Sequence, residues 1–381
     1  MRIKYLSDTD QDYKYLEYYI SSGSLGEMSE LWLIQAEKEN TQFIESLKSS
    51  FESHWPRELI EKYTSETYGS VIELPTRYDS IIQYKILSGL VGKIIGSIGS
   101  LELEHNGFPK YATLPTGEVN ACAIDLPGSS KDFLLFDSQL FNYCHLFSKA
   151  FSLCLPLRVQ TDEQVQLSVD INEVIDHVNN NKNSCKSKMH DLLYSFCIEG
   201  RPGNAKQYLP PTGYITFIDL IRDGMELMIV GHEFGHYFSG HLQSNIKQAL
   251  TKAEQEGSIS KEHLEEHEAD YWGAVLSMHA LNEKGYDAAL AYIGVDLFFS
   301  AMILSARFSS LMSGLKDEHF KEKESLTHPS FSSRQIFLRR AILEVEGINI
   351  HADHIKNLYL FYDKCIGFLW SELVKANKRV N

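Results

Sequence analysis

His232-Glu233-Phe234-Gly235-His236 is the stretch on which the interpretation of this chain depends. The two histidines are four residues apart, so in a helix their side chains lie one above the other on one face. Both imidazoles can then reach one metal ion at the roughly 2.0–2.1 Å of a Zn–N bond. Glu233 lies beside the open coordination position, where a carboxylate can take a proton from water and return it to a leaving amine. The five residues therefore predict two zinc ligands and a general base.

The motif alone does not decide the matter, because a chain of 381 residues with fifteen histidines contains it by chance in roughly one case in twenty. A zinc ion held by two histidines needs a third protein ligand, so the downstream sequence is informative. The metzincin pattern requires glycine three residues and histidine six residues after His236. Ser239 and Leu242 occupy those positions, which excludes that class.

The segment Glu266-His267-Glu268-Ala269-Asp270 offers the third ligand on a second predicted helix, Lys261 to about Asn282. Glu266 and Asp270 share a helical face one turn apart. We expect Glu266 to bind the metal and Asp270 to accept a hydrogen bond from the far nitrogen of His232, which fixes the histidine tautomer. Glu265 and Glu268 remain alternative ligands, and a solvated acidic face remains the alternative to any site.

Composition limits the classes of function. The net charge is −15 and no block of lysine or arginine is present, so we do not expect nucleic acid as a partner. The six cysteines are scattered without a CxxC pair, which favours free thiols in a reducing compartment. Met1 to Asp10 turns acidic before any apolar run, which argues against a secretory signal, so we expect a cytoplasmic location.

Hydrophobic periodicity predicts a mainly helical α+β fold with a small sheet. Ser80 to about Leu101 is a helical run rich in glycine, whose small residues favour close helix packing, and Gly117 to Phe141 has the pattern of a β-hairpin around Pro127-Gly128. The zinc helix should start near Thr216 or Asp219 and run to about Leu242. The expected organisation is an N-terminal helical region of unknown role over 1–110, a catalytic domain over 111–345 with an insertion at about 155–214, and a C-terminal helix over 346–381.

Ala288 to Ala306 is almost wholly apolar and is the one candidate for a membrane span that the sequence suggests. Asp296 lies near its middle, where a charge costs about 2.5–3.5 kcal/mol on insertion scales. We therefore interpret this stretch as a buried helix packed behind the zinc site. Membrane association is not expected, and a membrane-associated peptidase remains an alternative.

Four segments, in the same order along the chain as in the family, resemble the gluzincin metallopeptidases, and within them the CAAX prenyl protease/HtpX-like family. They cover perhaps 120 residues of the chain, mainly between 117 and 340. Met228 to His236 resembles that family's zinc helix, and Glu266 to Asp270 resembles its second ligand segment. The others are Val119-Asn120-Ala121-Cys122-Ala123 with Pro127-Gly128, similar to the family's hairpin, and Thr327-His328-Pro329-Ser330 with Arg334 and Leu338, similar to its THPxxxxR element.

The resemblance implies a zincin-type domain and a zinc-dependent endopeptidase that acts on a protein or peptide. It implies that His328 stabilises the oxyanion of the tetrahedral intermediate and that Arg334 ties its segment to an acidic neighbour. It also implies that the hairpin's edge strand, here Phe133, Leu134, Leu135 and Phe136, receives extended substrate by strand addition.

The chain departs from the family in two places. Ile124-Asp125-Leu126 lengthens the hairpin, with Ser129-Ser130 in place of a second glycine, and Leu155 to Tyr214 separates the hairpin from the zinc helix. Three alternative functions follow from what the motifs leave open. They are an aminopeptidase, a narrow effector that cuts one protein, and a catalytically inactive zinc-binding pseudoprotease that serves as an interaction module.

Overall fold

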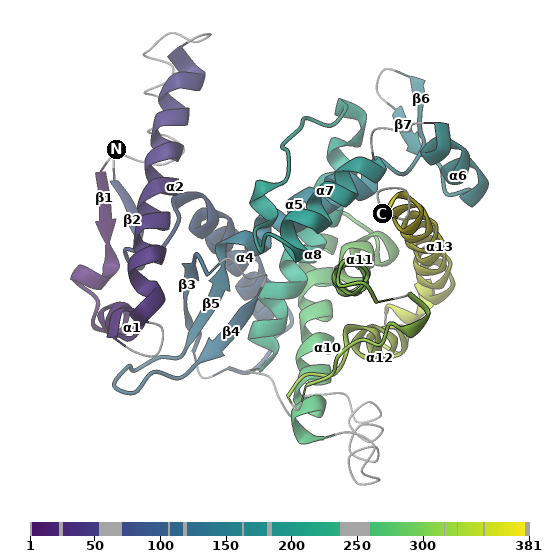
Figure 1. Ribbon diagram of the computed structural model, residues 1–381. Coiled ribbons are helices and arrows are strands. Elements are labelled where there is room, and N and C mark those ends of the chain that lie inside the picture. Colours follow the sequence, from purple (N-terminus) through teal and green to yellow (C-terminus); the bar gives the residue numbers. More distant parts are fainter. Residues whose placement is uncertain are drawn as a thin grey trace. The chain divides into compact units, whose positions relative to one another are not determined.

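The structure is a computed structural model, and it describes residues 2–22, 26–52, 71–105, 107–116, 120–161, 164–180, 185–236, 260–315, 317–325, 327–345 and 347–377. Within these ranges the chain is predominantly helical with three small sheets, which confirms the predicted α+β class (Figure 1). It divides into two compact units, the first made of Met1–Val91 and Asn106–Leu140 and the second of Gly92–His105 and Phe141–Asn381.

The first unit combines helices with two of the sheets. Its elements are β1 (Arg2–Tyr5), η1 (Leu6–Asp8), α1 (Gln11–Ser22), α2 (Gly26–Glu52), β2 (Val71–Leu74), the first half of α4 (Ile81–Ser100), β3 (Lys110–Leu114), β4 (Ala121–Ile124) and β5 (Phe133–Asp137). β1 pairs with β2 in parallel. The prediction of a purely helical N-terminal region is therefore wrong. The strands were missed because four residues are too few to show a clear alternation.

β5 is the central strand of the sheet β3-β5-β4. It pairs with β4 in antiparallel fashion, which confirms the predicted hairpin, and with β3 in parallel fashion. All five of its residues are buried. The expectation that Phe133 to Phe136 forms a substrate-binding edge is therefore wrong, because β3 and β4 already occupy both of its hydrogen-bonding sides.

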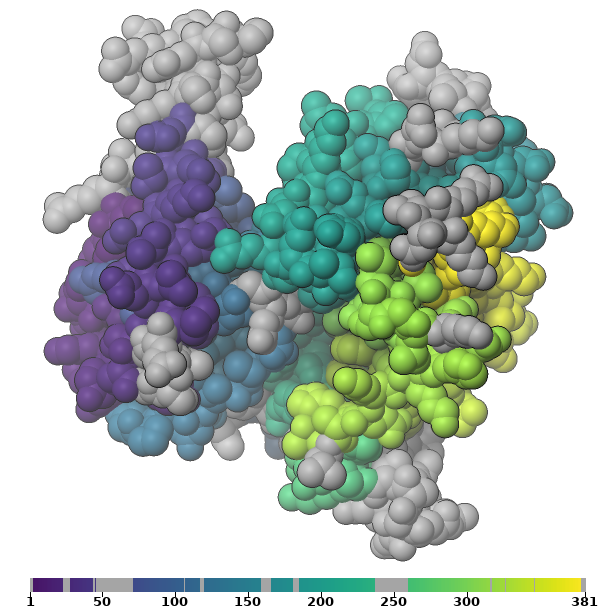
Figure 2. Space-filling view, in the orientation of Figure 1, coloured from purple at the N-terminus to yellow at the C-terminus, as the bar shows by residue number. Residues whose placement is uncertain are grey.

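The second unit contains the remaining elements. They are α5 (Ser138–Ser152), β6 (Leu157–Thr161), β7 (Gln164–Leu167), α6 (Ile171–Asn180), α7 (Cys185–Cys197), η2 (Pro202–Asn204), η3 (Thr212–Tyr214), α8 (Ile215–Gly235), α10 (Lys261–Asn282), α11 (Ala288–Met312), η5 (Asp317–His319), α12 (Phe331–Leu343), η6 (Asn349–His351) and α13 (Ala352–Asn377). α13 packs against α6, and their yellow and teal surfaces adjoin in the space-filling view (Figure 2).

Hydrogen-bonded N-caps set the start of three of these helices. Ser260 accepts from the backbone of His263 at the start of α10, and Asp287 and Ser330 do the same for α11 and α12. α10 has the bounds expected from the sequence. α8 begins close to the predicted residue, whereas its expected continuation to Leu242 lies outside the described residues.

α8 packs backbone to backbone on α10 and on α11. A Cβ on Gly231 would lie 2.9 Å from the carbonyl oxygen of Gly273, and a Cβ on Gly235 would lie 2.6 Å from that of Ala269. Gly224 meets Gly294 of α11 in the same way, at 2.8 Å from its Cα. Only glycine allows such an approach. These contacts bring the helix of the HExxH motif against the helix that carries Glu266.

The glycine-rich helix α4 behaves differently from our expectation. A Cβ at Gly89, Gly92, Gly96 or Gly99 would meet nothing within 4 Å in the described part of the chain. These glycines therefore do not mediate close helix packing, although their spacing suggested it.

α11 is the core helix of the second unit, as predicted, and it packs directly against α8. Its buried Asp296 binds Arg339 of α12 through both carboxylate oxygens at 2.7 Å, and Arg339 also binds Asp363 of α13. Among the described helices, α4 and α11 are long and apolar enough to cross a membrane by length and composition, with 44% and 72% of their windows buried. Burial and the paired Asp296 favour a role for α11 in the protein core.

Candidate metal centre

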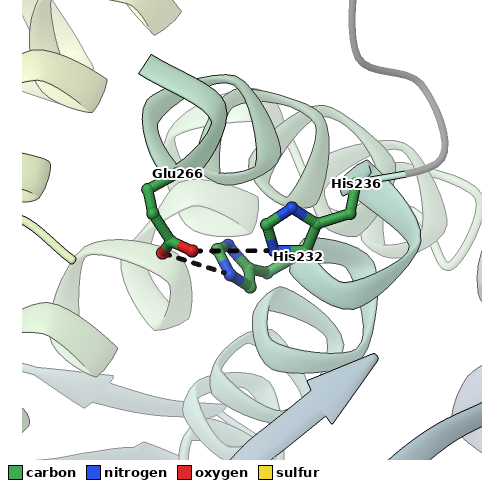
Figure 3. A group of neighbouring side chains, drawn as sticks. All are labelled: His232, His236 and Glu266. Carbon is green, nitrogen blue, oxygen red and sulfur yellow. Dashed lines mark ion pairs between the residues drawn. The ribbon is translucent and has the colours of Figure 1, made fainter. Parts of the chain in front are cut away.

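Two imidazoles and one carboxylate converge where the end of α8 meets the first half of α10 (Figure 3). His232 lies in the last turn of α8 and His236 is the residue that follows it. Glu266 lies in the second turn of α10. The glycine contacts between the two helices explain why these side chains face one another.

Glu266 lies between the two histidines. Its Oε2 is 3.7 Å from His232 Nε2 and its Oε1 is 3.8 Å from His236 Nε2. The three side chains each offer one ligand atom, and these atoms lie within 4.8 Å of one another. Zinc bonds of 2.0–2.1 Å place tetrahedral ligand atoms about 3.3 Å apart, so a small closure of the cluster fits the ion. The group could hold a metal ion.

The second carboxylate, Asp270, fixes the tautomer of His232. It is completely buried, and its Oδ1 accepts a hydrogen bond from His232 Nδ1 at 3.0 Å. Arg334 Nη2 lies 3.3 Å from the same nitrogen, but a guanidinium only donates, so the Nδ1 proton is directed to Asp270. The lone pair of Nε2 consequently faces Glu266.

Arg334 comes from α12 and neutralises both carboxylates. Its Nε and Nη2 donate to the two oxygens of Asp270 at 2.7 and 2.6 Å, and its Nη1 lies 3.2 Å from Glu266 Oε2. Burial alone raises the pKa of Asp270, but the charge and hydrogen bonds of Arg334 outweigh it and hold that pKa well below its usual value. Asp270 is therefore ionised, as a partner of a metal-binding histidine should be.

The two histidines differ in their proton affinity. Burial lowers the pKa of His236 to about 4, with a further contribution from His232, so its imidazole is neutral at pH 7. Burial also acts to lower the pKa of His232, but the hydrogen bond to Asp270 outweighs it and raises that pKa overall. Only a neutral imidazole can bind a metal, so metal and proton compete for these nitrogens.

Glu233 is buried beside the two ligands on α8, with 5% of its surface exposed. Burial raises the pKa of its carboxyl to about 7, the charge of His232 lowers it, and that of Glu266 raises it. A carboxyl group with a pKa near 7 can both accept and donate a proton at neutral pH, which is the requirement for a general acid–base.

His328 reaches the same cluster from the loop before α12. Its Nε2 is 3.4 Å from Glu266 Oε1, although 60% of its side chain is exposed. Ser325 holds the loop, because its side chain accepts from His328 N at 2.8 Å and its backbone N donates to His328 O at 3.0 Å. The structure thus brings together His232, Glu233, His236, Glu266, Asp270, His328 and Arg334, which the sequence singled out.

The neighbouring acidic and imidazole groups of α10 do not join the cluster. Glu265 has 44% of its side chain exposed and pairs with Lys261 at 3.5 Å. Glu268 is buried outside the group of possible ligands. His267 packs against Phe337 with ring centroids 4.5 Å apart.

Two supporting residues were missed by the sequence analysis. Glu322 accepts from Phe331 N and Ser332 N, so it anchors the start of α12, the helix that carries Arg334. His263 Nε2 contacts Ser325 O at 3.0 Å and links α10 to the loop of His328. Glu322 lies among alternating lysines and glutamates, and no local pattern distinguishes it from a solvent-exposed glutamate.

Comparison with protein-family models, with curated proteins and with solved structures gave no match to this chain. The functional argument therefore depends on the geometry and chemistry of the metal centre.

Proposed function

We propose that this protein is a zinc-dependent endopeptidase with a zincin-type domain, similar to the gluzincins, and that it hydrolyses a protein or peptide substrate. The support is the candidate metal centre of the second unit, where two imidazoles and a carboxylate converge. Asp270 accepts a hydrogen bond from His232 Nδ1, on the side of the ring away from the other ligands.

One observation carries most of this proposal. Glu266 Oε2 is buried and has no hydrogen-bond partner in the described part of the chain, although it lies 3.7 Å from His232 Nε2. When His232 is neutral, Asp270 takes the Nδ1 proton, so the Nε2 lone pair faces a carboxylate oxygen of Glu266, which is unfavourable unless a metal ion or a proton lies between them. Arg334 neutralises Glu266 only from one side.

The donor set fits zinc, since two imidazole nitrogens and one carboxylate oxygen leave one position open for catalysis. When bound, zinc would act as a Lewis acid that polarises the scissile carbonyl and lowers the pKa of water to about 7. His232, His236 and Glu266 would hold it.

The chain's own groups supply the proton transfers. Glu233 would take a proton from the attacking water and give it to the leaving amine, a function that suits its buried carboxyl. His328, with its exposed imidazole near Glu266, would donate a hydrogen bond to the oxyanion of the tetrahedral intermediate. Arg334 is a positioning residue, because it holds Asp270 and through it His232.

The test compares Glu266→Gln with Glu265→Gln, a matched change one residue away at an exposed position. Zinc content and cleavage of a random peptide library are measured for both variants and the wild type. We expect about one zinc per chain and cleavage in the wild type and Glu265→Gln, and loss of both in Glu266→Gln.

Two results would contradict the proposal. If Glu266→Gln retains zinc and cleavage, Glu266 is not the third ligand. If the wild type holds zinc and cleaves neither the library nor full-length proteins, the centre belongs to an inactive zinc-binding protein, which is the alternative reading of the motif.

A further inference from the structure

The second unit contains a cavity of about 1260 Å³ between α7 and the C-terminal part of α13. Residues from the end of α11 and from the loop after η2 complete its wall, and none of the residues of the metal centre lines it. Binding sites for small ligands have volumes of about 300–1000 Å³, so the cavity has room for one.

The lining of this cavity is basic in a chain that is strongly acidic overall. Among the described residues, its lining contains four lysines and two carboxylates: Lys186, Lys188, Lys206, Lys375, Asp191 and Glu372. Lys186 and Lys375 both bind Glu372, at 2.5 and 2.8 Å, so that carboxylate is already used. The described lining therefore carries a net positive charge, whereas the whole chain has 51 acidic and 36 basic residues.

Lys188 and Lys206 have no ion pair with a carboxylate of the described chain. The Lys188 ammonium lies over the ring of Tyr208, 3.4 Å from its centroid, and the ammonium of the buried Lys149 lies 4.4 Å from the same ring. Asp191 accepts a hydrogen bond from the backbone N of Lys206 at 2.7 Å. The hydroxyl of Tyr208 is buried and has no partner among the described residues.

The lysines destabilise one another in the absence of an anion. Burial and then the charge of Lys206 lower the pKa of Lys188, and the charge of Asp191 opposes this only in part. Burial and then the charge of Lys188 lower the pKa of Lys149. Like charges gathered at one cavity reduce stability, Asp191 offsets this only in part, and an anion in the cavity would reduce the repulsion further.

The remaining wall suits a compact ligand with a planar part. The rings of His190 and Tyr194 stack with an interplanar angle of 12°, and Tyr194 has 38% of its surface exposed. Met312 and Leu373 supply apolar surface. The wall thus combines a mostly polar and charged lining with a small apolar and aromatic surface.

We propose that this cavity binds a small phosphate-bearing anion through Lys188 and Lys206. Lysine is a common phosphate ligand because its ammonium acts as a point charge with three donors. The ligand is either a free polyphosphate or a nucleotide whose base packs on Tyr194, and both share the phosphate group that the lysines recognise.

The test is isothermal titration calorimetry of the full-length, zinc-loaded protein with inorganic pyrophosphate and, separately, with adenosine diphosphate. The variants are Lys188→Gln and Lys206→Gln. Lys364→Gln is the matched control, because it removes the same charge from an exposed position of α13 outside the cavity. Glu266→Gln serves as a second control, because a bound metal can also attract an anion.

We expect one saturable site, an affinity about tenfold weaker in each cavity variant, and no change in Lys364→Gln. Equal affinities for the two ligands identify phosphate alone as the recognised group, and tighter adenosine diphosphate identifies a nucleotide. The proposal is overturned if neither ligand saturates by about 10 mM. It is also overturned if Lys364→Gln weakens binding as much as the cavity variants, or if only Glu266→Gln abolishes it.

Discussion

Asp270 connects the proposed metal ligand His232 to the buried guanidinium of Arg334. Asp270→Asn removes the charge that orients His232, so we expect zinc affinity to fall about 10–100-fold, as is typical when such a partner is lost. Competition with a zinc chelator measures this. The change also leaves Arg334 less compensated, which costs stability.

The double variant Asp270→Asn/Arg334→Gln separates the two effects, because it contains no unpaired guanidinium. Its stability should recover in urea unfolding while its zinc affinity stays low. Wild-type zinc affinity in Asp270→Asn would show that the hydrogen bond to His232 does not support the metal.

Glu226 of α8 makes folding stability depend on pH. Burial raises its pKa to about 8, and the charge of Arg222 offsets only part of this. In the unfolded chain its pKa is near 4.5. The contribution of Glu226 is thus most favourable below pH 4.5, is lost progressively as the pH rises to about 8, and then stays constant.

Glu226→Gln keeps the shape of the protonated side chain at every pH. We therefore expect the variant to equal the wild type in stability near pH 4.5 and to be more stable by a few kcal/mol at pH 8–9. Urea unfolding at pH 5, 7 and 9 measures the difference. A stability difference that does not grow with pH would contradict this assignment.

At the scale of the element, the contact between α8 and α10 builds the metal centre. Gly231→Ala places a methyl group 2.9 Å from the carbonyl oxygen of Gly273, so the helices must separate. We expect a loss of about 1–3 kcal/mol in the free energy of unfolding and weaker zinc binding.

Gly96→Ala is the matched control for Gly231→Ala. It lies inside the helix α4 where a Cβ would meet nothing within 4 Å in the described chain. It should be neutral or stabilise the protein by up to about 1 kcal/mol, the difference in helix propensity between the two residues. Equal effects of the two substitutions would show that the close approach of α8 and α10 is not needed.

Local signals predicted the two helices of the site, α8 and α10, and the sheet only in part, and they gave no prediction of α5, α6 or α7. The periodic run from Lys261 to Asn282 predicted the bounds of α10. The spacing of His232 and His236 predicted that both lie on one face at the C-terminal end of α8. Strand order depends on distant pairing, so β3 was missed and β5 was mistaken for an edge. The glycines are visible in the sequence, but which of them pair is a tertiary property.

The metal centre shows the same limit. Spacing within one helix could indicate that His232 and His236 share a metal, and that Glu266 and Asp270 share a face. It could not show that Arg334 reaches both carboxylates, nor that Glu322 fixes the helix that carries it. The Arg334 contacts join distant parts of the chain, and only the resemblance drew attention to Arg334. The Glu322 contact is local, but no sequence pattern marks it.

At the scale of the whole molecule, Arg339 joins three helices of the second unit. It binds Asp296 of α11 and Asp363 of α13 from α12, the helix that also delivers Arg334 to the metal centre. Arg339→Met removes the cationic partner of the buried Asp296, so we expect a loss of about 3–5 kcal/mol in urea unfolding.

The double variant Arg339→Met/Asp296→Asn removes the uncompensated charge and should regain part of that loss. If the single and the double variant are equally stable, the buried charge of Asp296 is not the cause. Arg339 does not contact the proposed metal ligands in the described chain, so zinc affinity should fall in Arg339→Met only if α12, which carries Arg334, is displaced.

The most direct test of the central claim, zinc-dependent peptide hydrolysis with Glu233 as the base, is to measure zinc content and peptide cleavage on the same preparation of Glu233→Gln. Glu233 is not one of the three metal ligands, so we predict that zinc stays at the wild-type level while cleavage falls by about 10²–10⁴-fold. A variant that keeps its zinc and cleaves as fast as the wild type would contradict the account.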